Sequence, residues 1–214
     1  MTVRMTVAAG ARPLQLLLSI VMAVGLAACQ TFPQPIAPNA APDQVLAGWP
    51  ARRAQLQSRG QFSAQGRIGV VAGSDGFNGR VRWLQEGERS TVSLDGPLGV
   101  AGVRIVNETG VLTVTTPSGE ALDSQAAHDE LVRLMGVEPP LNSLRYWVQG
   151  VPDPGGPSTE TPDAQGYLGT LEQSGWTVTY GAYMQTEGGA LPQKLTVERG
   201  SVRVKLIIDA WHAT

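Results

Sequence analysis

The chain of 214 residues is poor in cysteine and histidine, two side chains that enzymes often use for nucleophilic catalysis or metal binding. It holds one cysteine, Cys29, so no disulfide can form within it. Its two histidines, His128 and His212, lie far apart, and neither belongs to a metal-ligand spacing such as H-E-x-x-H. A G-x-S-x-G nucleophile motif is absent as well. We therefore predict a protein that is not an enzyme and that carries neither a metal nor an organic cofactor.

Positive charge is also scarce. The formal net charge is −2, and residues 1–28 contribute two arginines and no acidic residue. Without those residues, 14 basic side chains face 18 acidic ones, which is a net charge of −4. Nucleic acids and anionic lipid surfaces are bound through basic patches. We expect no nucleic-acid partner and no electrostatic docking on a membrane.

An apolar run near the N-terminus is too short to span a bilayer. It extends from Leu14 to Leu26 and follows the basic residues Arg4 and Arg12. A transmembrane helix needs about 20 apolar residues. A basic start, a short apolar run and small residues before a cleavage point are the parts of a secretory signal. We predict a signal peptide over residues 1–28.

The end of this segment, Leu26-Ala27-Ala28-Cys29, resembles the lipobox of bacterial lipoproteins. In a lipobox the cysteine thiol is diacylglycerated and the chain is cut just before it. The alternative is an ordinary signal peptide followed by a chance cysteine. An acidic residue after the cysteine retains lipoproteins at the inner membrane, and Gln30 is not acidic. The resemblance implies a lipid on Cys29 and a location at the outer membrane, facing the periplasm.

The next stretch is too rich in proline for regular structure. Thr31–Pro42 holds four prolines, which disfavour both helix and sheet. We expect residues 29–42, the acylated cysteine and this segment, to form an extended tether. Residues 43–214 are enough for one domain with a hydrophobic core.

Beyond the tether, apolar residues recur with two different periods. Helical spacing predicts a helix over Asp123–Met135 that ends at Gly136, and a second helix from Pro140 to Gly150. An earlier helix either begins near Pro50 or breaks there. The segment Val151–Gly166, rich in Pro, Gly, Ser and Asp, is expected to be a mobile surface loop. Alternating apolar residues bounded by turn residues predict short antiparallel strands around positions 61–70, 77–83, 92–94, 103–105, 112–114, 176–180, 195–197 and 202–208.

Many short strands and few helices predict a mainly β fold with helices (α+β). The apolar face of such a sheet must be covered or closed on itself. We expect one strongly curved antiparallel sheet that forms an incomplete, half-open β-barrel, with the helices as a lid over its open side. Because helices rarely fill a concave sheet completely, we also expect an apolar cavity between lid and sheet.

Six short motifs together resemble the LolB family, outer-membrane receptors that insert lipoproteins delivered by a soluble carrier. Leu141–Gly150 (LNSLRYWVQG) resembles the second-helix signature of that family. The other five motifs are Gly66–Gly69, Val81–Gln85, Gly96–Gly99, Gly175–Tyr183 and Arg203–Trp211. The resemblance covers nearly all of the chain from Trp49 to Trp211. The proline-rich tether and the long loop after Gly150 depart from the family pattern.

The resemblance implies a function as well as a fold. It implies that the chain receives lipoproteins from a LolA-like periplasmic carrier and inserts them into the inner leaflet of the outer membrane. Their acyl chains would occupy the apolar cavity, and the protein would act as a monomer. Two other functions remain open: a structural or assembly lipoprotein with a packed barrel, and a lipid-modifying enzyme.

Twelve apolar residues of the predicted sheet and lid are candidates for lining the acyl cavity. On their pattern alone a packed core is the commoner outcome, and the resemblance favours a ligand cavity for the group. The candidates are Val81, Trp83, Val92, Ile105, Leu131, Leu134, Leu144, Trp147, Trp176, Val178, Leu195 and Leu206.

A last candidate, Leu98, lies at the tip of a predicted turn. In Asp95-Gly-Pro-Leu-Gly99 the proline suits the second position of a turn and Gly99 the fourth. From the sequence alone, Leu98 folding back onto the core is the commoner outcome. In the LolB family the matching leucine protrudes and helps to move the lipoprotein into the membrane. The resemblance therefore implies a membrane-insertion role for Leu98.

Overall fold

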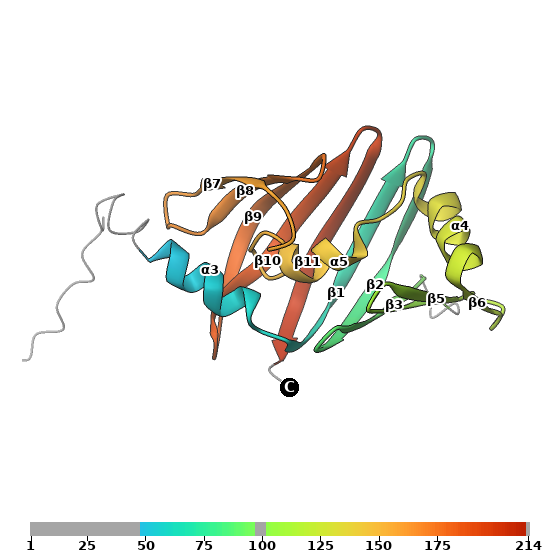
Figure 1. Ribbon diagram of the computed structural model, residues 1–214. Helices are drawn as coiled ribbons and strands as arrows, with labels where there is room; N and C mark the ends of the chain where they lie inside the picture. The colour runs from blue at the N-terminus through green and yellow to red at the C-terminus, as the bar shows by residue number, and fades with distance from the viewer. Residues whose placement is uncertain (1–47, 97–101, 213–214) are drawn as a thin grey trace, which may run out of the picture. The chain divides into compact units, whose positions relative to one another are not determined.

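A single antiparallel sheet forms most of the computed structural model, which describes residues 48–96 and 102–212 (Figure 1). All of these residues belong to the compact unit Ala40–Thr214. In the described ranges the sheet has 11 strands in the order β6-β5-β4-β3-β2-β1-β11-β10-β9-β8-β7. The strands are β1 (Gln61–Ala72), β2 (Asp75–Glu86), β3 (Arg89–Asp95), β4 (Val103–Glu108), β5 (Val111–Thr115), β6 (Ala121–Asp123), β7 (Ser158–Pro162), β8 (Leu168–Gln173), β9 (Trp176–Thr186), β10 (Gly189–Arg199) and β11 (Val202–His212).

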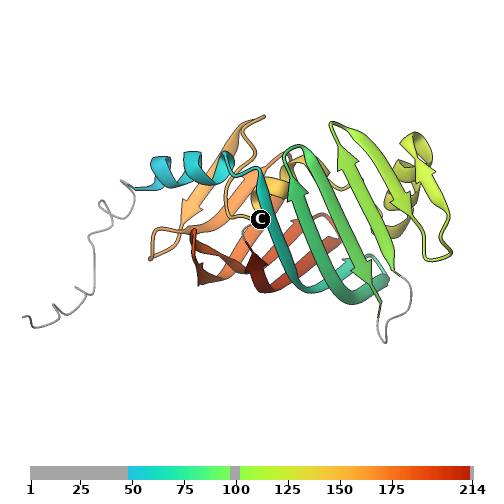
Figure 2. The same ribbon diagram turned by 90° about the horizontal axis from the view of Figure 1, so that it is seen from below.

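The first and last long strands, β1 and β11, pair at the middle of the sheet, so each half is a simple meander. Their register shifts between Gln65 and Gly66. A Cβ atom on Gly66 would lie only 2.1 Å from the carbonyl oxygen of Ile207, so only glycine fits there. Such a bulge increases the local twist of a strand pair. Figure 2 shows the resulting curvature of the sheet from below.

The sheet does not close on itself. Its two ends, β6 and β7, pair on one side only and lie at opposite ends of the strand order. Three helices occur in the described ranges: α3 (Trp49–Gln57), α4 (Ser124–Met135) and α5 (Leu141–Trp147). All three lie across the same face of the sheet (Figure 1). The predicted half-open barrel with a helical lid is confirmed.

The helix boundaries follow local signals that the sequence carries. Pro50 lies in the first turn of α3, where its missing N–H costs nothing, so the helix begins there rather than breaking. Helix α4 ends at Gly136, whose φ of 71° is left-handed and favours glycine. Helix α5 follows Pro140 and ends at Trp147, slightly before the predicted stop at Gly150.

The prediction of a mobile loop over Val151–Gly166 is wrong. The segment contains strand β7, which pairs with β8, and Val151 is fully buried. Strand β7 has the sequence STETP, which is polar because the strand lies at the edge of the sheet and is partly exposed. Its closing Pro162 is tolerated because an edge strand has one unpaired side. The turn-forming composition therefore concealed a strand.

The core consists of three clusters that occupy different parts of the concave face. The largest lies between the central strands and α5 and includes Trp147 and Trp176. A second cluster joins β4 and β5 to Ala127 and Leu131 of α4. A third packs Leu56 of α3 against the segment after α5. No helix in ranges 48–96 and 102–212 is long and apolar enough to cross a membrane.

Candidate functional site

An apolar cavity of about 200 Å³ lies between the curved sheet and the lid helices α4 and α5. Nine of the twelve predicted residues line it: Val81, Trp83, Val92, Ile105, Leu131, Leu144, Trp176, Leu195 and Leu206. Whether these residues hold an acyl chain stays a prediction.

The strand register explains why these residues meet. Trp83 of β2 pairs with Val92 of β3, and Val92 pairs with Ile105 of β4. Residues paired in this way have side chains on the same face of the sheet. A second row crosses the other half, where Leu195 pairs with Leu206. The concave face therefore carries continuous rows of apolar side chains from strand to strand.

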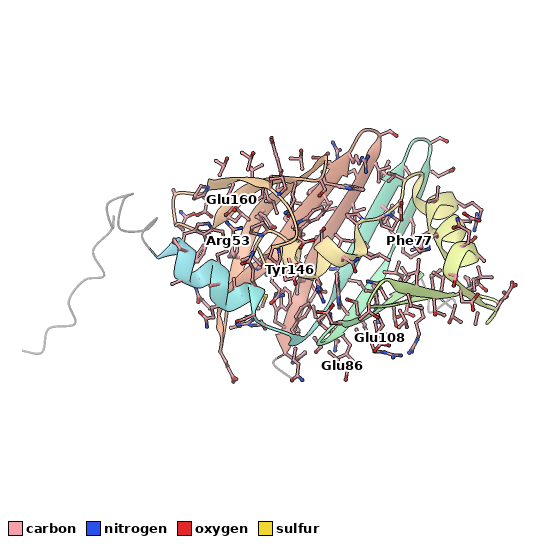
Figure 3. All side chains as sticks on the ribbon, viewed as in Figure 1. Arg53, Phe77, Glu86, Glu108, Tyr146 and Glu160 are labelled. Atoms are coloured by element: carbon pink, nitrogen blue, oxygen red, sulfur yellow. The ribbon has the colours of Figure 1, made fainter. Side chains whose placement is uncertain are left out.

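The sequence analysis missed part of the lining. Ile68, Val70, Phe77, Leu94, Val103, Leu141, Val148, Val197 and Val204 also contribute, together with Pro139, Pro140, Ser90 and Asn107. Most of the missed strand residues lie two positions from a predicted one, as Leu94 does from Val92. The alternation of side chains between the two faces of each strand would have identified these residues. Phe77 of β2, labelled in Figure 3, lines the same cavity as Leu131 of α4.

Two predicted lining residues, Trp147 and Val178, lie elsewhere. Both are fully buried in one packed core cluster, Trp147 from α5 and Val178 from β9. Val178 pairs with Val197, which does line the cavity, so Val178 continues the same row one strand further. There Val178 belongs to the same core cluster as Trp147 and Val148, so the row continues as packed core.

Three predicted site residues cannot be located. Cys29 and Leu98 lie outside the described residues. Leu134 belongs to α4, but its side chain is outside the described part of the chain. Their assigned roles stay predictions.

The polar groups nearest the cavity bond to one another. Ser90 Oγ donates to Gln85 Oε1 over 2.6 Å, and the indole Nε1 of Trp83 donates to the same oxygen over 3.2 Å. Gln85 Nε2 donates to the carbonyl oxygen of Gly87 at 2.9 Å. Because these donors are satisfied internally, the wall they form presents mainly apolar atoms to the cavity.

The two lid helices are attached differently. Helix α5 is tied to the sheet by Trp147, whose carbonyl oxygen accepts a 2.9 Å hydrogen bond from Tyr180 Oη. Burial raises the pKa of the Tyr180 phenol well above its usual range, so this donor keeps its proton. Helix α4 buries Ala127 and Leu131 against the short end of the sheet, while its Val132 is 41% exposed. In the described part of the chain, α4 is held to the sheet by apolar packing, whereas α5 is also hydrogen-bonded to it.

In the described ranges, few features of the site point to a chemistry other than the binding of apolar groups. They contain no cluster of three or more His, Cys, Asp or Glu side chains that could hold a metal ion. The cavity is lined by apolar residues except for Ser90 and Asn107. The arrangement suits an apolar ligand that enters between sheet and lid.

Comparisons with known proteins agree in one family. The family model described as outer membrane lipoprotein LolB matches residues 60–211. Outer-membrane lipoprotein LolB of Nitrosococcus oceani is 32% identical over 198 residues, which cover 92% of this chain and 95% of that protein. The LolB protein of Azoarcus sp. is 32% identical over 163 residues, 76% of this chain and 84% of its own.

A solved structure shares the fold. A DUF1329 family protein from Desulfovibrio piger superposes with a TM-score of 0.54 at 9% identity, covering 79% of this chain and 92% of that one. The family match spans nearly all of the sheet, helices α4 and α5 and every described residue of the cavity lining. The chain therefore belongs to the LolB family of outer membrane lipoproteins.

Proposed function

We propose that this protein receives acylated lipoproteins from a soluble periplasmic carrier and inserts them into the inner leaflet of the outer membrane. The observation that carries the proposal is the apolar cavity enclosed by an open sheet and a helical lid. Burying an acyl chain gains about 0.8 kcal/mol per methylene, so a lined pocket can hold a chain that water cannot. Transfer between two such pockets and a bilayer is a binding equilibrium and requires no catalytic residue.

The lid must move for an acyl chain to enter. The cavity volume is about 200 Å³, whereas pockets for small ligands hold roughly 300–1,000 Å³. Helix α4 is the part that we expect to move, because its described side chains hold it to the sheet by apolar packing through Ala127 and Leu131, without a hydrogen bond to the sheet. Helix α5 stays in place, since Trp147 is fully buried and bonded on two sides.

The anchor completes the proposal. We place the lipid on Cys29, with residues 1–28 removed and residues 29–42 as a tether for the domain 43–214. An anchor of three acyl chains on the cysteine exceeds by far the two membrane-binding signals that stable anchoring needs. The domain would then work at the inner face of the outer membrane as a monomer that meets a LolA-like carrier. Replacing Cys29 with Ala should release the protein from the membrane, and Gln30→Asp should shift it to the inner membrane.

Depletion in the native host tests the function. After expression is shut off, newly made lipoproteins are pulse-labelled and the inner membrane, periplasm and outer membrane are separated. We expect labelled lipoproteins to accumulate in complex with the soluble carrier and at the inner membrane. Normal arrival of lipoproteins at the outer membrane in depleted cells contradicts the proposal. Expression of the Cys29→Ala variant distinguishes the need for the anchor from the need for the domain.

A further inference from the structure

A second hollow adjoins the apolar cavity. Its volume is about 460 Å³. Six residues line both spaces and form the boundary between them: Asn107, Leu131, Pro139, Pro140, Leu141 and Trp176. A molecule that fills the apolar cavity and extends across this boundary reaches the second hollow directly.

The remaining walls of this second hollow are mostly polar, unlike those of the cavity; besides Gly110 and Leu112 they include His128, Glu138 and Ser174. Asn142, Ser143 and Asp153 line it on one side, and Arg199 lines it beside Trp176. The Arg199 guanidinium lies 5.8 Å from the centre of the Trp176 ring. Trp176 thus contacts a charged group as well as the apolar cavity that it lines. We name this space the polar vestibule.

Amide side chains stand at the boundary. Asn107 Nδ2 donates a 2.8 Å hydrogen bond to Asn142 Oδ1. Asn107 is only 6% exposed, whereas Asn142 is exposed at the start of α5. This bond occupies the Asn142 oxygen as an acceptor and leaves the Asn142 Nδ2 donors directed to other partners. Ser143 Oγ donates to Asp153 Oδ2 over 2.7 Å and so holds the next wall in place.

We infer that the polar vestibule binds the polar junction of an acylated polypeptide, namely the ester and amide groups that join the acyl chains to the first backbone amides. The inference rests on the proposed function and adds a second binding subsite to it. An acyl chain is attached directly to a carbonyl group, so burial of the chain brings that carbonyl to the cavity boundary. A carbonyl that loses water without gaining a donor weakens binding.

Asn142 presents neutral amide donors to this ligand beside the charged side chains of Glu138, Asp153 and Arg199 that also line the hollow. The junction carries ester and amide carbonyls and peptide N–H groups but no net charge. Asn142 offers N–H donors for the carbonyls, and the prolines of the boundary hold their backbone rigidly beside it. A plain alkane of the same length has no polar head group and would occupy the apolar cavity alone. The polar vestibule therefore distinguishes a lipoprotein from a simple hydrocarbon.

Photolabelling of the full-length protein in phospholipid vesicles tests the location. The probe is a synthetic peptide whose N-terminal cysteine carries three palmitoyl chains. One version has a diazirine at the end of an acyl chain, and another has it on the residue after the cysteine. We expect the acyl-end label on cavity residues such as Ile105, and the peptide-side label on the segment 142–153. Mass spectrometry of the digested protein locates both.

The outcomes separate this inference from the proposed function. Acyl-end labelling of the cavity with peptide-side labelling elsewhere, for example on the β1–β2 hairpin, overturns the polar vestibule alone. Absence of acyl-end labelling from the cavity overturns the acyl-binding function and the inference with it. Labelling of both expected regions supports the two together.

An isosteric variant tests the chemistry. Asn142→Asp keeps the acceptor for Asn107 and removes the N–H donors. We expect the concentration of unlabelled triacyl peptide that halves labelling to rise about five-fold, as loss of one hydrogen bond to a neutral group predicts. The concentration of hexadecane, which has no head group, that halves acyl-end labelling should not change. Asn78→Asp, the same change at an exposed residue outside both linings, is the control. Equal competition by the peptide in all three proteins overturns the inference.

Discussion

The indole Nε1 of Trp147 donates a 2.8 Å hydrogen bond to Gln173 Oε1, and this bond joins helix α5 to strand β8. The same oxygen accepts a hydrogen bond from the backbone N–H of Asp153 at 2.9 Å. Gln173 Nε2 in turn donates to the carbonyl oxygen of Asp153 at 2.8 Å. One buried amide therefore fixes both α5 and the segment that follows it. This clamp makes α5 the static half of the lid.

Removing the clamp should destabilise the domain. Gln173→Ala leaves the Trp147 indole N–H and two backbone groups of Asp153 without this partner in a buried site. We expect the free energy of unfolding to fall by about 3 kcal/mol, since each unsatisfied buried group costs about 1–3 kcal/mol. Urea denaturation followed by tryptophan fluorescence measures the change.

The neighbouring exposed residue on β8 provides the control. Glu172→Ala should change the free energy of unfolding by less than about 0.5 kcal/mol, as surface substitutions do. Equal losses for Gln173→Ala and Glu172→Ala would mean that the amide does not hold α5.

The fold was predictable from the sequence because strand alternation is a local signal. The pattern of Val81 and Trp83 on one face of β2 needs no knowledge of a partner strand. The edge strand β7 was missed because a partly exposed edge needs no apolar alternation, and Thr159 and Thr161 carry none. Register was not predictable either. It depends on features such as the bulge at Gly66, which appears only when β11 lies beside β1.

A charge in the apolar cavity should abolish uptake of an apolar ligand. Ile105 is 7% exposed and lines the cavity from β4. Ile105→Glu places a carboxylate where the wall offers it no cation, so we expect uptake of a fluorescent fatty acid to fall at least about ten-fold. We also expect the free energy of unfolding to fall by about 3 kcal/mol. A fluorescence titration measures uptake, and near-ultraviolet circular dichroism first confirms that the variant is folded.

Val111→Glu is the matched control, because Val111 is 61% exposed on the next strand. It should leave uptake unchanged. A folded Ile105→Glu variant with wild-type uptake would refute the cavity assignment. Failure of the wild-type protein to take up the probe would instead favour a packed barrel with a structural role.

A disulfide between α4 and the sheet should block entry to the cavity. A Cβ atom on Gly136, at the end of α4, would lie 3.7 Å from the Cβ of Ala72 on β1, which suits a disulfide. We expect the oxidised Ala72→Cys, Gly136→Cys variant to take up the fatty-acid probe at least about ten-fold less than its reduced form, because the closed cavity is smaller than typical ligand pockets. The domain 43–214 contains no other cysteine, so the pairing is unambiguous.

The reduced form and the two single variants are the controls. Cysteine at Gly136 adopts a left-handed φ of 71°, which costs about 1–2 kcal/mol, so the single Gly136→Cys variant shows the effect of that strain alone. Full uptake by a completely oxidised sample would mean that the chain enters without movement of α4.

The candidate site was only partly predictable, and the reason is physical. Val178 and Val197 lie side by side on one face of the sheet, yet Val197 lines the cavity and Val178 is fully buried in the core. Apolar alternation reports which face of a strand is buried, not what covers it. Whether a helix or an empty space covers a residue on the buried face of the sheet depends on the position that the lid adopts. That position depends on long-range contacts such as the one between Trp147 and Gln173.

The loop between β3 and β4 leaves the sheet at the cavity. The last pair before it, Leu94 and Val103, lines the cavity from both strands. A Cβ atom on Gly102 would lie 1.6 Å from the carbonyl oxygen of Leu94, so the chain must remain glycine at that point to turn back so closely. Leu98 belongs to this loop, outside the described residues, so we expect it to act where a ligand leaves the cavity for the membrane.

Leu98→Glu should therefore slow insertion without unfolding the domain. Burial of one leucine in a lipid interface gains about 1.5–3 kcal/mol, too little to anchor a protein but enough to hold the cavity against the bilayer during release. Loss of that contact should slow transfer of a lipoprotein into vesicles by about ten-fold or more. Transfer from the carrier to the protein should stay at the wild-type rate. Val71→Glu, at a valine that is 50% exposed, adds the same charge elsewhere and should change neither step. If Leu98→Glu unfolds the domain, the leucine is a core residue, and if insertion keeps its wild-type rate, the membrane-contact role is refuted.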